Sequence, residues 1–225
     1  INDFADRNLD GQVSRTANRP LATGRVSSKE ALAIAALIGM LAFALVLYTN
    51  RFTILLSVGG LLLACTYPYM KRHTYLPQLV LGAAFAWSVP MAFAAVGESV
   101  PEHAWLIYLA TVAWTMAYDT LYAMVDREDD LRAGIKSTAI LFGDADLVMI
   151  SILNALALLS LWLLGNRLEF SVWYFLGLGT AALLLVWQLW QCRSRDTNAC
   201  FNAFLHNHWV GAVIFVGVFL HYSLS

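Results

Sequence analysis

The sequence predicts an all-α protein, a polytopic bundle of transmembrane helices with short cytoplasmic helices around an active site. Three observations lead to this fold class. Of the 225 residues, 60% are hydrophobic and only 13% are charged, whereas a soluble domain contains roughly 25% charged residues. The apolar residues form runs long enough to cross a bilayer, which takes about 20 residues. Lysine and arginine are concentrated in a few of the segments between these runs.

The first four candidate spans are apolar runs bounded by charged residues, proline or glycine. They cover approximately residues 31–49, 53–69, 76–97 and 104–125. Because the connectors between them are short, we expect each of these helices to run antiparallel to its neighbour. One of the connectors, 70–75, contains charged residues that could take part in a reaction, Lys71 and Arg72.

Three further spans follow a longer polar stretch at 126–146. They cover approximately residues 147–165, 171–191 and 208–224. The long polar stretch and the opening segment 1–30, together with 70–75, hold nearly all of the residues that could take part in a reaction. The chain therefore contains seven predicted spans with its chemistry confined to three connecting segments.

The distribution of positive charge tests this arrangement. Alternation of the spans puts the polar segments 1–30, 70–75, 126–146 and 192–207 on one side of the membrane. These segments contain twelve of the fourteen lysines and arginines, and only Arg51 and Arg167 lie on the other side. Cytoplasmic loops carry an excess of positive residues, so we expect this side to be cytoplasmic.

Several other classes of site are not supported. Cys65, Cys192 and Cys200 lack the spacing of a zinc site or of a disulfide framework. There is no Walker loop, dinucleotide fingerprint or nucleophile elbow. The sequence begins at Ile1, directly beside a charged motif, and we expect that an earlier part of a helix precedes it.

The first candidate site is an acidic motif in residues 2–10. Asn2, Asp6 and Asp10 are spaced i, i+4, i+8, which places them along one face of a helix. Like charges four residues apart destabilise a helix, so a divalent cation is expected to compensate. Mg²⁺ suits this role because it binds through one or two carboxylates together with substrate phosphates. A solvated helix end with exposed acids is the alternative interpretation.

A second acidic motif occupies residues 118–130. Asp119, Tyr122, Asp126 and Asp130 fall at offsets 0, 3, 7 and 11, again along one helical stripe. Asp119 lies within an otherwise apolar span, where an ionisable residue indicates function. Metal ions bridging two acidic stripes would hold a diphosphate and stabilise departing pyrophosphate. The two motifs together therefore predict an allylic diphosphate substrate.

Cationic residues between and after the motifs could complete the site. Arg72 stands out because rigid and aromatic residues flank its connector, and Lys136 follows the second motif. Arginine suits bidentate recognition of phosphate or carboxylate, whereas lysine acts as a point charge. The remaining cations are better explained by membrane topology than by ligand binding: Arg15, Arg19, Arg25 and Lys71.

These motifs resemble those of the UbiA prenyltransferase family. The resemblance rests on the first motif with Arg15, Thr16 and Arg19, and on the second motif followed by GIKSTAILFG at 134–143. Residues 67–72 and 76–78 are similar to the branch of the family that acts on 4-hydroxybenzoate. The family has nine transmembrane helices, with its first motif at the end of the second. The resemblance thus implies that residues 1–225 are a single transmembrane prenyltransferase domain without roughly its first two helices.

The resemblance also implies roles for individual residues. Mg²⁺ and the diphosphate would be coordinated by Asn2, Asp6, Asp10, Asp126 and Asp130. Phosphate oxygens would contact Arg7 and Lys136, and Asp119 and Tyr122 are expected to line the substrate site. Arg72 would bind either the carboxylate of the aromatic acid or the diphosphate. The expected catalytic residues are Asp6, Asp10, Asp126, Asp130 and Arg72.

The implied reaction is Mg²⁺-dependent transfer of a polyprenyl group to the ring carbon ortho to the hydroxyl of 4-hydroxybenzoate. Diphosphate is released, and the pathway is ubiquinone biosynthesis at the inner membrane of a bacterial cell. Another acceptor, such as homogentisate, a naphthoate or haem, is the alternative within the family. A CDP-alcohol phosphotransferase is disfavoured because its acids form one compact run. A transporter is disfavoured because its ionisable residues lie near the bilayer midplane. No nucleic-acid or protein partner is expected.

Overall fold

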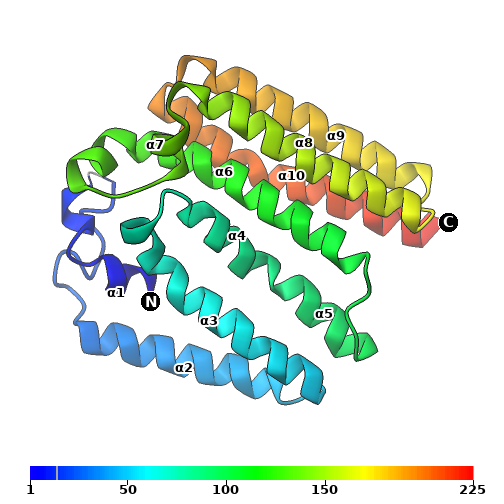
Figure 1. Ribbon diagram of the computed structural model, residues 1–225, viewed down its shortest axis with the longest axis horizontal. Coiled ribbons are helices and arrows are strands. Elements are labelled where there is room, and N and C mark those ends of the chain that lie inside the picture. Colours follow the sequence, from blue (N-terminus) through cyan, green and yellow to red (C-terminus); the bar gives the residue numbers. More distant parts are fainter. Residues whose placement is uncertain (14, 225) are drawn as a thin grey trace.

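The computed structural model describes residues 1–13 and 15–224, and all regular secondary structure within them is helical. The all-α prediction is confirmed. The long helices lie side by side along the long axis of the molecule, and α1 and α7 lie at one end (Figure 1). In chain order the elements are α1 (Asn2–Asp6), η1 (Asp10–Gln12), α2 (Ser28–Val46), α3 (Arg51–His73), α4 (Pro77–Ala86), α5 (Ser88–Gly97), α6 (Ala104–Ala133), α7 (Thr138–Phe142), η2 (Gly143–Ala145), α8 (Asp146–Arg167), α9 (Val172–Gln191), η3 (Cys192–Ser194) and α10 (Thr197–Leu224).

In the described part of the chain, six helical segments are long and apolar enough to cross a membrane, judged by length and composition. These segments are Ser28–Val46, Arg51–His73, Pro77–Gly97, Thr138–Arg167, Val172–Ser194 and Thr197–Leu224. The seventh predicted span, 104–125, forms the first part of α6 and is less apolar than the others. The physical reason is that α6 packs against α4, α8 and α10, so much of its surface meets protein and can be polar.

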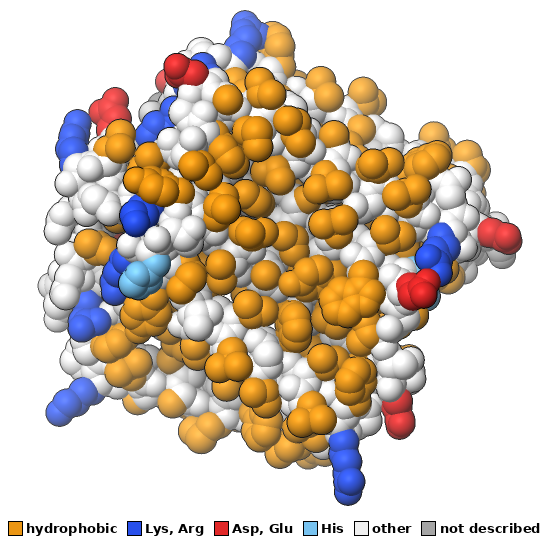
Figure 2. Space-filling model, viewed as in Figure 1, with side chains coloured by type: hydrophobic (Ala, Val, Ile, Leu, Met, Phe, Trp, Pro, Cys, Tyr) orange, Lys and Arg blue, Asp and Glu red, His pale blue; other side chains and the backbone are white. Residues whose placement is uncertain are grey.

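The outer surface matches a bundle solvated by lipid. Hydrophobic side chains cover the broad middle of the face in Figure 2, and charged side chains lie towards its edges. Helix α2 has no buried residue, although its composition is strongly apolar. An apolar helix that is exposed along its whole length is rare on soluble monomers and marks a membrane or interaction surface.

Helix boundaries follow from local sequence signals. Ser27 and Glu30 form a reciprocal capping box at the start of α2. The predicted span 76–97 is divided into α4 and α5 at Trp87, because Pro90 lacks the N–H that would continue the helical hydrogen bonds. The indole Nε1 of Trp87 donates to the carbonyl of Leu56 at 2.7 Å, which fixes the break against α3.

The four polar segments that the sequence places on one side of the membrane meet at one end of the bundle. Three contacts join them: Lys136 N to Lys71 O at 2.9 Å, Arg15 to Asp126, and Arg195 to Asp146. Helix α6 ends there at Ala133, and the following Gly134 has a φ of +69°, which glycine readily adopts. The chain then turns back towards the end of α3 and closes one wall of a cavity.

Candidate active site

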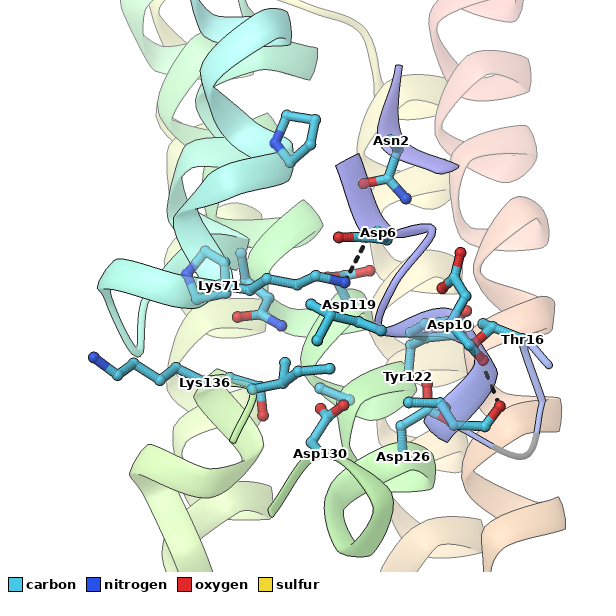
Figure 3. A pocket seen from close by; sticks show the side chains of 18 of the residues that line it. Asn2, Asp6, Asp10, Thr16, Lys71, Asp119, Tyr122, Asp126, Asp130 and Lys136 are labelled. Carbon is cyan, nitrogen blue, oxygen red and sulfur yellow. Dashed lines mark hydrogen bonds and ion pairs between the residues drawn. The ribbon is translucent and has the colours of Figure 1, made fainter. Parts of the chain in front are cut away.

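A polar cavity of about 260 Å³ lies where these segments meet (Figure 3). Its walls come from α1, η1, residues that follow η1, the second half of α3, the start of α4, the second half of α6 and residues 135–137. The structure places eight of the predicted site residues in this lining: Asn2, Asp6, Asp10, Asp119, Tyr122, Asp126, Asp130 and Lys136. The two acidic motifs, more than a hundred residues apart in sequence, therefore face one shared space.

The first motif is not the continuous helix that its spacing predicts. Helix α1 ends at Asp6, and Asp10 begins the separate turn η1. Carboxylates four residues apart repel each other on a helix, and here Asp6 and Asp10 are bound by different cations. Asn2, Asp6 and Asp10 nevertheless all line the cavity.

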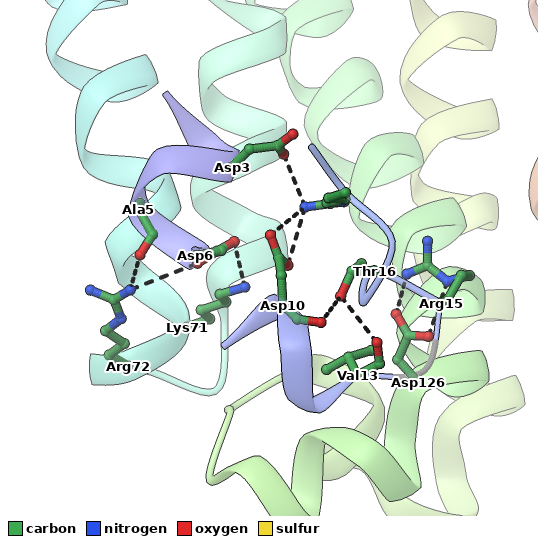
Figure 4. Close-up of polar contacts among 11 residues, drawn as sticks. Asp3, Ala5, Asp6, Asp10, Val13, Arg15, Thr16, Lys71, Arg72 and Asp126 are labelled. Carbon is green, nitrogen blue, oxygen red and sulfur yellow. Dashed lines mark hydrogen bonds and ion pairs between the residues drawn. The ribbon is translucent and has the colours of Figure 1, made fainter. Parts of the chain in front are cut away.

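Asp6 is almost completely buried, with 1% of its surface exposed. Lys71 Nζ lies 2.6 Å from its Oδ2, and Arg72 Nη2 lies 3.8 Å from its Oδ1 (Figure 4). Burial raises the pKa of Asp6 above its ordinary value, and the hydrogen bond from Lys71 partly offsets that effect. Among the described residues, Asp6 Oδ1 accepts no hydrogen bond.

Asp10 is held by Arg19 in the segment that follows η1. Arg19 Nη1 lies 3.3 Å from each carboxylate oxygen of Asp10 and 3.0 Å from Oδ1 of Asp3. Thr16 Oγ1 also donates to the backbone carbonyl of Asp10 at 2.9 Å. These contacts fold the opening segment back on itself and keep the Asp10 side chain at the cavity.

The second motif lies on the continuous helix α6. Asp119, Tyr122, Asp126 and Asp130 all face the cavity from this helix. Arg15 Nε donates to Asp126 Oδ1 at 3.1 Å, and Nη2 of the same guanidinium binds the other carboxylate oxygen. That guanidinium also lies 3.9 Å from the centroid of the Tyr122 ring, within the range of a cation–π contact.

Asp130 lies one helical turn beyond Asp126, at the end of α6. Burial, with a further contribution from the nearby charge of Asp126, raises the pKa of Asp130 to about 7. A carboxyl group of this kind holds its proton until a cation or a higher pH removes it. The cavity thus contains acids in different electrostatic environments.

The sequence profile of the UbiA prenyltransferase family matches residues 1–218. The chain belongs to this family. It is 58% identical over 224 residues to the 4-hydroxybenzoate octaprenyltransferase of Ectopseudomonas mendocina (strain ymp), covering 100% of this chain and 76% of that protein. It is 57% identical, with the same coverage, to the 4-hydroxybenzoate octaprenyltransferase of Pseudomonas fluorescens (strain Pf0-1).

Solved structures of UbiA homologues share the fold. The apo structure of a UbiA homologue from Aeropyrum pernix K1 superposes with a TM-score of 0.83 at 27% identity, over 96% of this chain and 82% of that one. A UbiA homologue from Archaeoglobus fulgidus bound to GPP and Mg²⁺ gives a TM-score of 0.63 at 19% identity, over 99% and 81% of the two chains. At this lower identity the likeness concerns the fold.

In this UbiA-family chain, three cationic residues predicted for the site, Lys136, Arg7 and Arg72, hydrogen-bond to backbone carbonyls. Lys136 lines the cavity, but its Nζ donates to the carbonyl of His73 at 3.3 Å and its side chain points away from the carboxylates in Figure 3. Arg7 binds the carbonyl of Phe4 at 2.5 Å, and Arg72 binds the carbonyl of Ala5. Neither arginine is among the residues that line the cavity.

Gln78 is a site residue whose importance the sequence analysis missed. It is 5% exposed, its Oε1 accepts a hydrogen bond from Thr138 N at 3.1 Å, and it lines the cavity together with Asp119. Gln78 therefore joins α4 to α7 in the wall of the cavity. The available signal was a polar residue directly after Pro77, at the start of a helix that is otherwise apolar.

The acids fit a metal ion that arrives with ligands of its own. Within the described part of the chain, no group of three or more His, Cys, Asp or Glu side chains could hold a metal ion alone. The cavity instead offers hard oxygen ligands on two walls, including Oδ1 of Asp6, which accepts no hydrogen bond among the described residues. Mg²⁺ commonly keeps several waters and binds one or two carboxylates together with substrate phosphates, so this donor set fits a magnesium–diphosphate complex.

Proposed function

We propose that this UbiA-family protein transfers a polyprenyl group from a polyprenyl diphosphate to 4-hydroxybenzoate. The new bond forms at the ring carbon ortho to the hydroxyl, diphosphate leaves, and a proton is lost from that carbon. The observation that supports this proposal is the convergence of both acidic motifs on one cavity. The 58% identity to a 4-hydroxybenzoate octaprenyltransferase supports the choice of acceptor.

The metal ligands proposed are Asn2, Asp6, Asp10, Asp126 and Asp130. When bound, Mg²⁺ neutralises the diphosphate and stabilises the charge that develops on the leaving group. The carboxylates themselves orient the diphosphate by fixing where the cation can sit. Their burial strengthens this effect, since electrostatic interactions are stronger where water is excluded.

Three cations that form ion pairs with the acids could also bind the phosphate oxygens of the substrate. Lys71, Arg15 and Arg19 all line the cavity. Arginine binds phosphate in a bidentate manner and lysine as a point charge. Arg7 and Lys136 remain proposed phosphate ligands, which would require their side chains to turn from the carbonyls of Phe4 and His73.

An apolar cavity of about 430 Å³ between α4, α6 and α10 is suited to the isoprenoid tail. Trp114, Tyr118 and Phe204 line it. The Phe204 ring lies 6.0 Å from the Tyr118 ring and 4.9 Å from the Tyr122 ring, measured between centroids. Because Tyr122 lines the polar cavity, these adjoining rings connect the wall of the polar cavity with the wall of the apolar one.

The proposed location is the inner membrane of a bacterial cell, with the acidic cavity open to the cytoplasm and the pathway being ubiquinone biosynthesis. The distribution of lysine and arginine, twelve against two, supports this orientation. A water-soluble aromatic acid would then reach the cavity directly, while the prenyl substrate arrives from the lipid.

The decisive experiment supplies the purified protein in lipid with a radiolabelled polyprenyl diphosphate, Mg²⁺ and 4-hydroxybenzoate. We expect a prenylated hydroxybenzoate and free pyrophosphate in equal amounts, and no product in the presence of a chelator. Homogentisate and a dihydroxynaphthoate serve as competing acceptors. Product from one of these alone would replace the acceptor in the proposal, and no pyrophosphate release with any acceptor would contradict the reaction class.

A further inference from the structure

A second cluster of charges lies behind the second acidic motif. Asp146, the first residue of α8, is completely buried at 0% exposure. Arg127 Nη2 lies 2.5 Å from its Oδ2, and Arg195 approaches both oxygens, with Nη2 3.0 Å from Oδ1 and Nε 3.1 Å from Oδ2. The backbone N–H of Leu147 donates to Oδ1 at 2.7 Å. One carboxylate thus receives donors from three parts of the chain.

The two arginines come from elements distant in sequence. Arg127 is in α6, directly after Asp126, and Arg195 follows η3 in the connection to α10. Arg195 has a φ of +55°, a left-handed backbone conformation that residues other than glycine rarely adopt. Its guanidinium also donates to the carbonyl of Asp144 at 2.7 Å. The hydrogen bonds of Arg195 to Asp146 and to the carbonyl of Asp144 therefore offset the cost of its unfavourable backbone conformation.

The orientation of Arg127 depends on Asp146. Nε of Arg127 is buried and has no hydrogen-bond acceptor among the described residues, and Asp146 receives its Nη2. Removing the Asp146 carboxylate would leave both arginines without their anionic partner, and a buried charge without compensation is strongly destabilising. The cluster therefore fixes Arg127 against α8.

Fixing Arg127 has two effects on Asp126. It sets the rotation of the last turns of α6, on which Asp126 and Asp130 face the cavity. It also holds a cation away from Asp126, since both residues border one groove of about 640 Å³ on the outer side of α6. A released Arg127 could join Arg15 in neutralising Asp126 and so compete with a metal ion.

We propose that Asp146 is a positioning residue for the second acidic motif, acting through Arg127 and Arg195 to keep Asp126 oriented and available to a metal ion. This inference rests on the proposed function, because it assumes that Asp126 binds the metal. Asp146 itself is not among the residues that line the polar cavity.

The test measures binding of Mn²⁺ by electron paramagnetic resonance, with inorganic pyrophosphate present and without turnover. The full chain in detergent is compared with Asp146→Asn, which keeps the size of the side chain but removes its charge. We expect the variant to bind Mn²⁺ about tenfold more weakly, the range found when a residue that orients a metal ligand is changed. In an Asp126→Asn background, adding Asp146→Asn should cause no further loss.

Two control variants separate positioning from general damage. Tyr174→Phe removes the hydrogen bond from Tyr174 Oη to the carbonyl of Leu161 at the far end of α8, and should lower the melting temperature without changing Mn²⁺ affinity. Arg132→Ala removes an exposed arginine of α6 that pairs with Glu128 and Asp129, and should change neither quantity. If Asp146→Asn does not fold, Arg195→Gln removes one of the two arginines from a more exposed position and should weaken Mn²⁺ binding in the same direction.

The outcomes are distinguishable. Wild-type Mn²⁺ affinity in a folded Asp146→Asn or Arg195→Gln variant would overturn the inference and leave Asp146 a purely structural residue. Equal losses in the wild-type and Asp126→Asn backgrounds would also overturn it, because the effect would then not pass through Asp126. Failure of the unmodified protein to bind Mn²⁺ with pyrophosphate would instead contradict the proposed function.

Discussion

Arg15 binds the carboxylate of Asp126 at two points, across 111 residues of sequence. The pair joins the segment after the first acidic motif to the helix that bears the second (Figure 4). Tyr122 supports the arrangement, because its ring lies under the same guanidinium. The ion pair thus brings the two halves of the proposed site together and also occupies one of its proposed metal ligands.

Replacing Asp126 tests the central assignment. We expect Asp126→Ala to reduce prenyl transfer at least about 100-fold even at high Mg²⁺, since a group that stabilises developing charge contributes on this scale. The protein should still insert and fold, which circular dichroism in detergent can verify. Activity close to that of the wild type would remove Asp126 from the site.

Replacing Arg15 should move two affinities in opposite directions. Arg15→Ala frees the Asp126 carboxylate, so Mn²⁺ alone should bind more tightly than to the wild type. Pyrophosphate should bind more weakly, because a bidentate phosphate donor is lost. Titration of each ligand separately, by calorimetry, checks both signs. A parallel loss of both affinities would show that Arg15 only maintains the fold.

The raised pKa of Asp130 predicts a pH dependence. Below pH about 7 this carboxyl is protonated, so binding of Mg²⁺ with pyrophosphate should weaken as the pH falls from 8 to 6. Asp130→Asn should remove that pH dependence as well as weaken binding. Calorimetric titrations at several pH values in buffers of equal ionic strength would measure this, and an unchanged pH profile in the variant would assign the titration to another group.

The same group has a consequence for stability without metal. A carboxyl with a raised folded-state pKa retains its proton from about pH 4, the unfolded value, to pH about 7, so its contribution lowers stability as the pH rises through this window. Asp130→Asn should therefore melt several degrees higher than the wild type at pH 8 and show little difference near pH 4. Thermal unfolding with a chelator present provides the measurement, and a lower melting temperature at pH 8 would contradict the burial effect.

Arg72→Ala should distinguish the two roles left open for this residue. Arg72 lies beside Asp6 and binds the carbonyl of Ala5, so we expect its loss to raise the KM for the polyprenyl diphosphate more than the KM for the aromatic acid. Steady-state kinetics with each substrate varied in turn supplies the comparison. A larger rise in the KM for the acid would assign Arg72 to the benzoate carboxylate.

Gln78→Leu should destabilise the wall of the cavity. The substitution roughly keeps the volume of the side chain but leaves the N–H of Thr138 without its acceptor, at a cost of about 1–3 kcal/mol for an unsatisfied buried group. The free energy of unfolding measures this, and Thr180→Val, which removes an exposed hydroxyl bonded within its own helix, is the control. Equal stability of the two variants would contradict the role of Gln78.

The sequence was sufficient for those features that depend on local pattern. Apolar runs predicted the helices, and the alternation of charge predicted that the polar segments would share one end. The regular spacing of Asp119, Asp126 and Asp130 was informative because α6 is continuous through them. A periodic pattern can be interpreted in this way when one helix bears all of its members.

Features that depend on contacts between distant segments could not be predicted. The first motif is interrupted after Asp6 because Lys71 and Arg19 bind successive carboxylates, and no spacing rule specifies which cation binds which acid. Gln78 and Asp146 are single polar residues without a motif. Their importance is visible only once α4, α6 and α8 are packed together, since their partners lie 19 to 60 residues away.

The pairing of the acids with Lys71, Arg15 and Arg19 balances negative charge with positive charge inside the cavity. Mg²⁺ and diphosphate have opposite charges. When both bind, Mg²⁺ would replace a lysine or arginine beside each carboxylate, and the diphosphate would replace a carboxylate beside each lysine or arginine. Because the charges of Mg²⁺ and diphosphate largely cancel, the total charge at this end of the bundle would change little when both bind. Such a site can bind a highly charged substrate beside a low-dielectric membrane without leaving a protein charge unpaired.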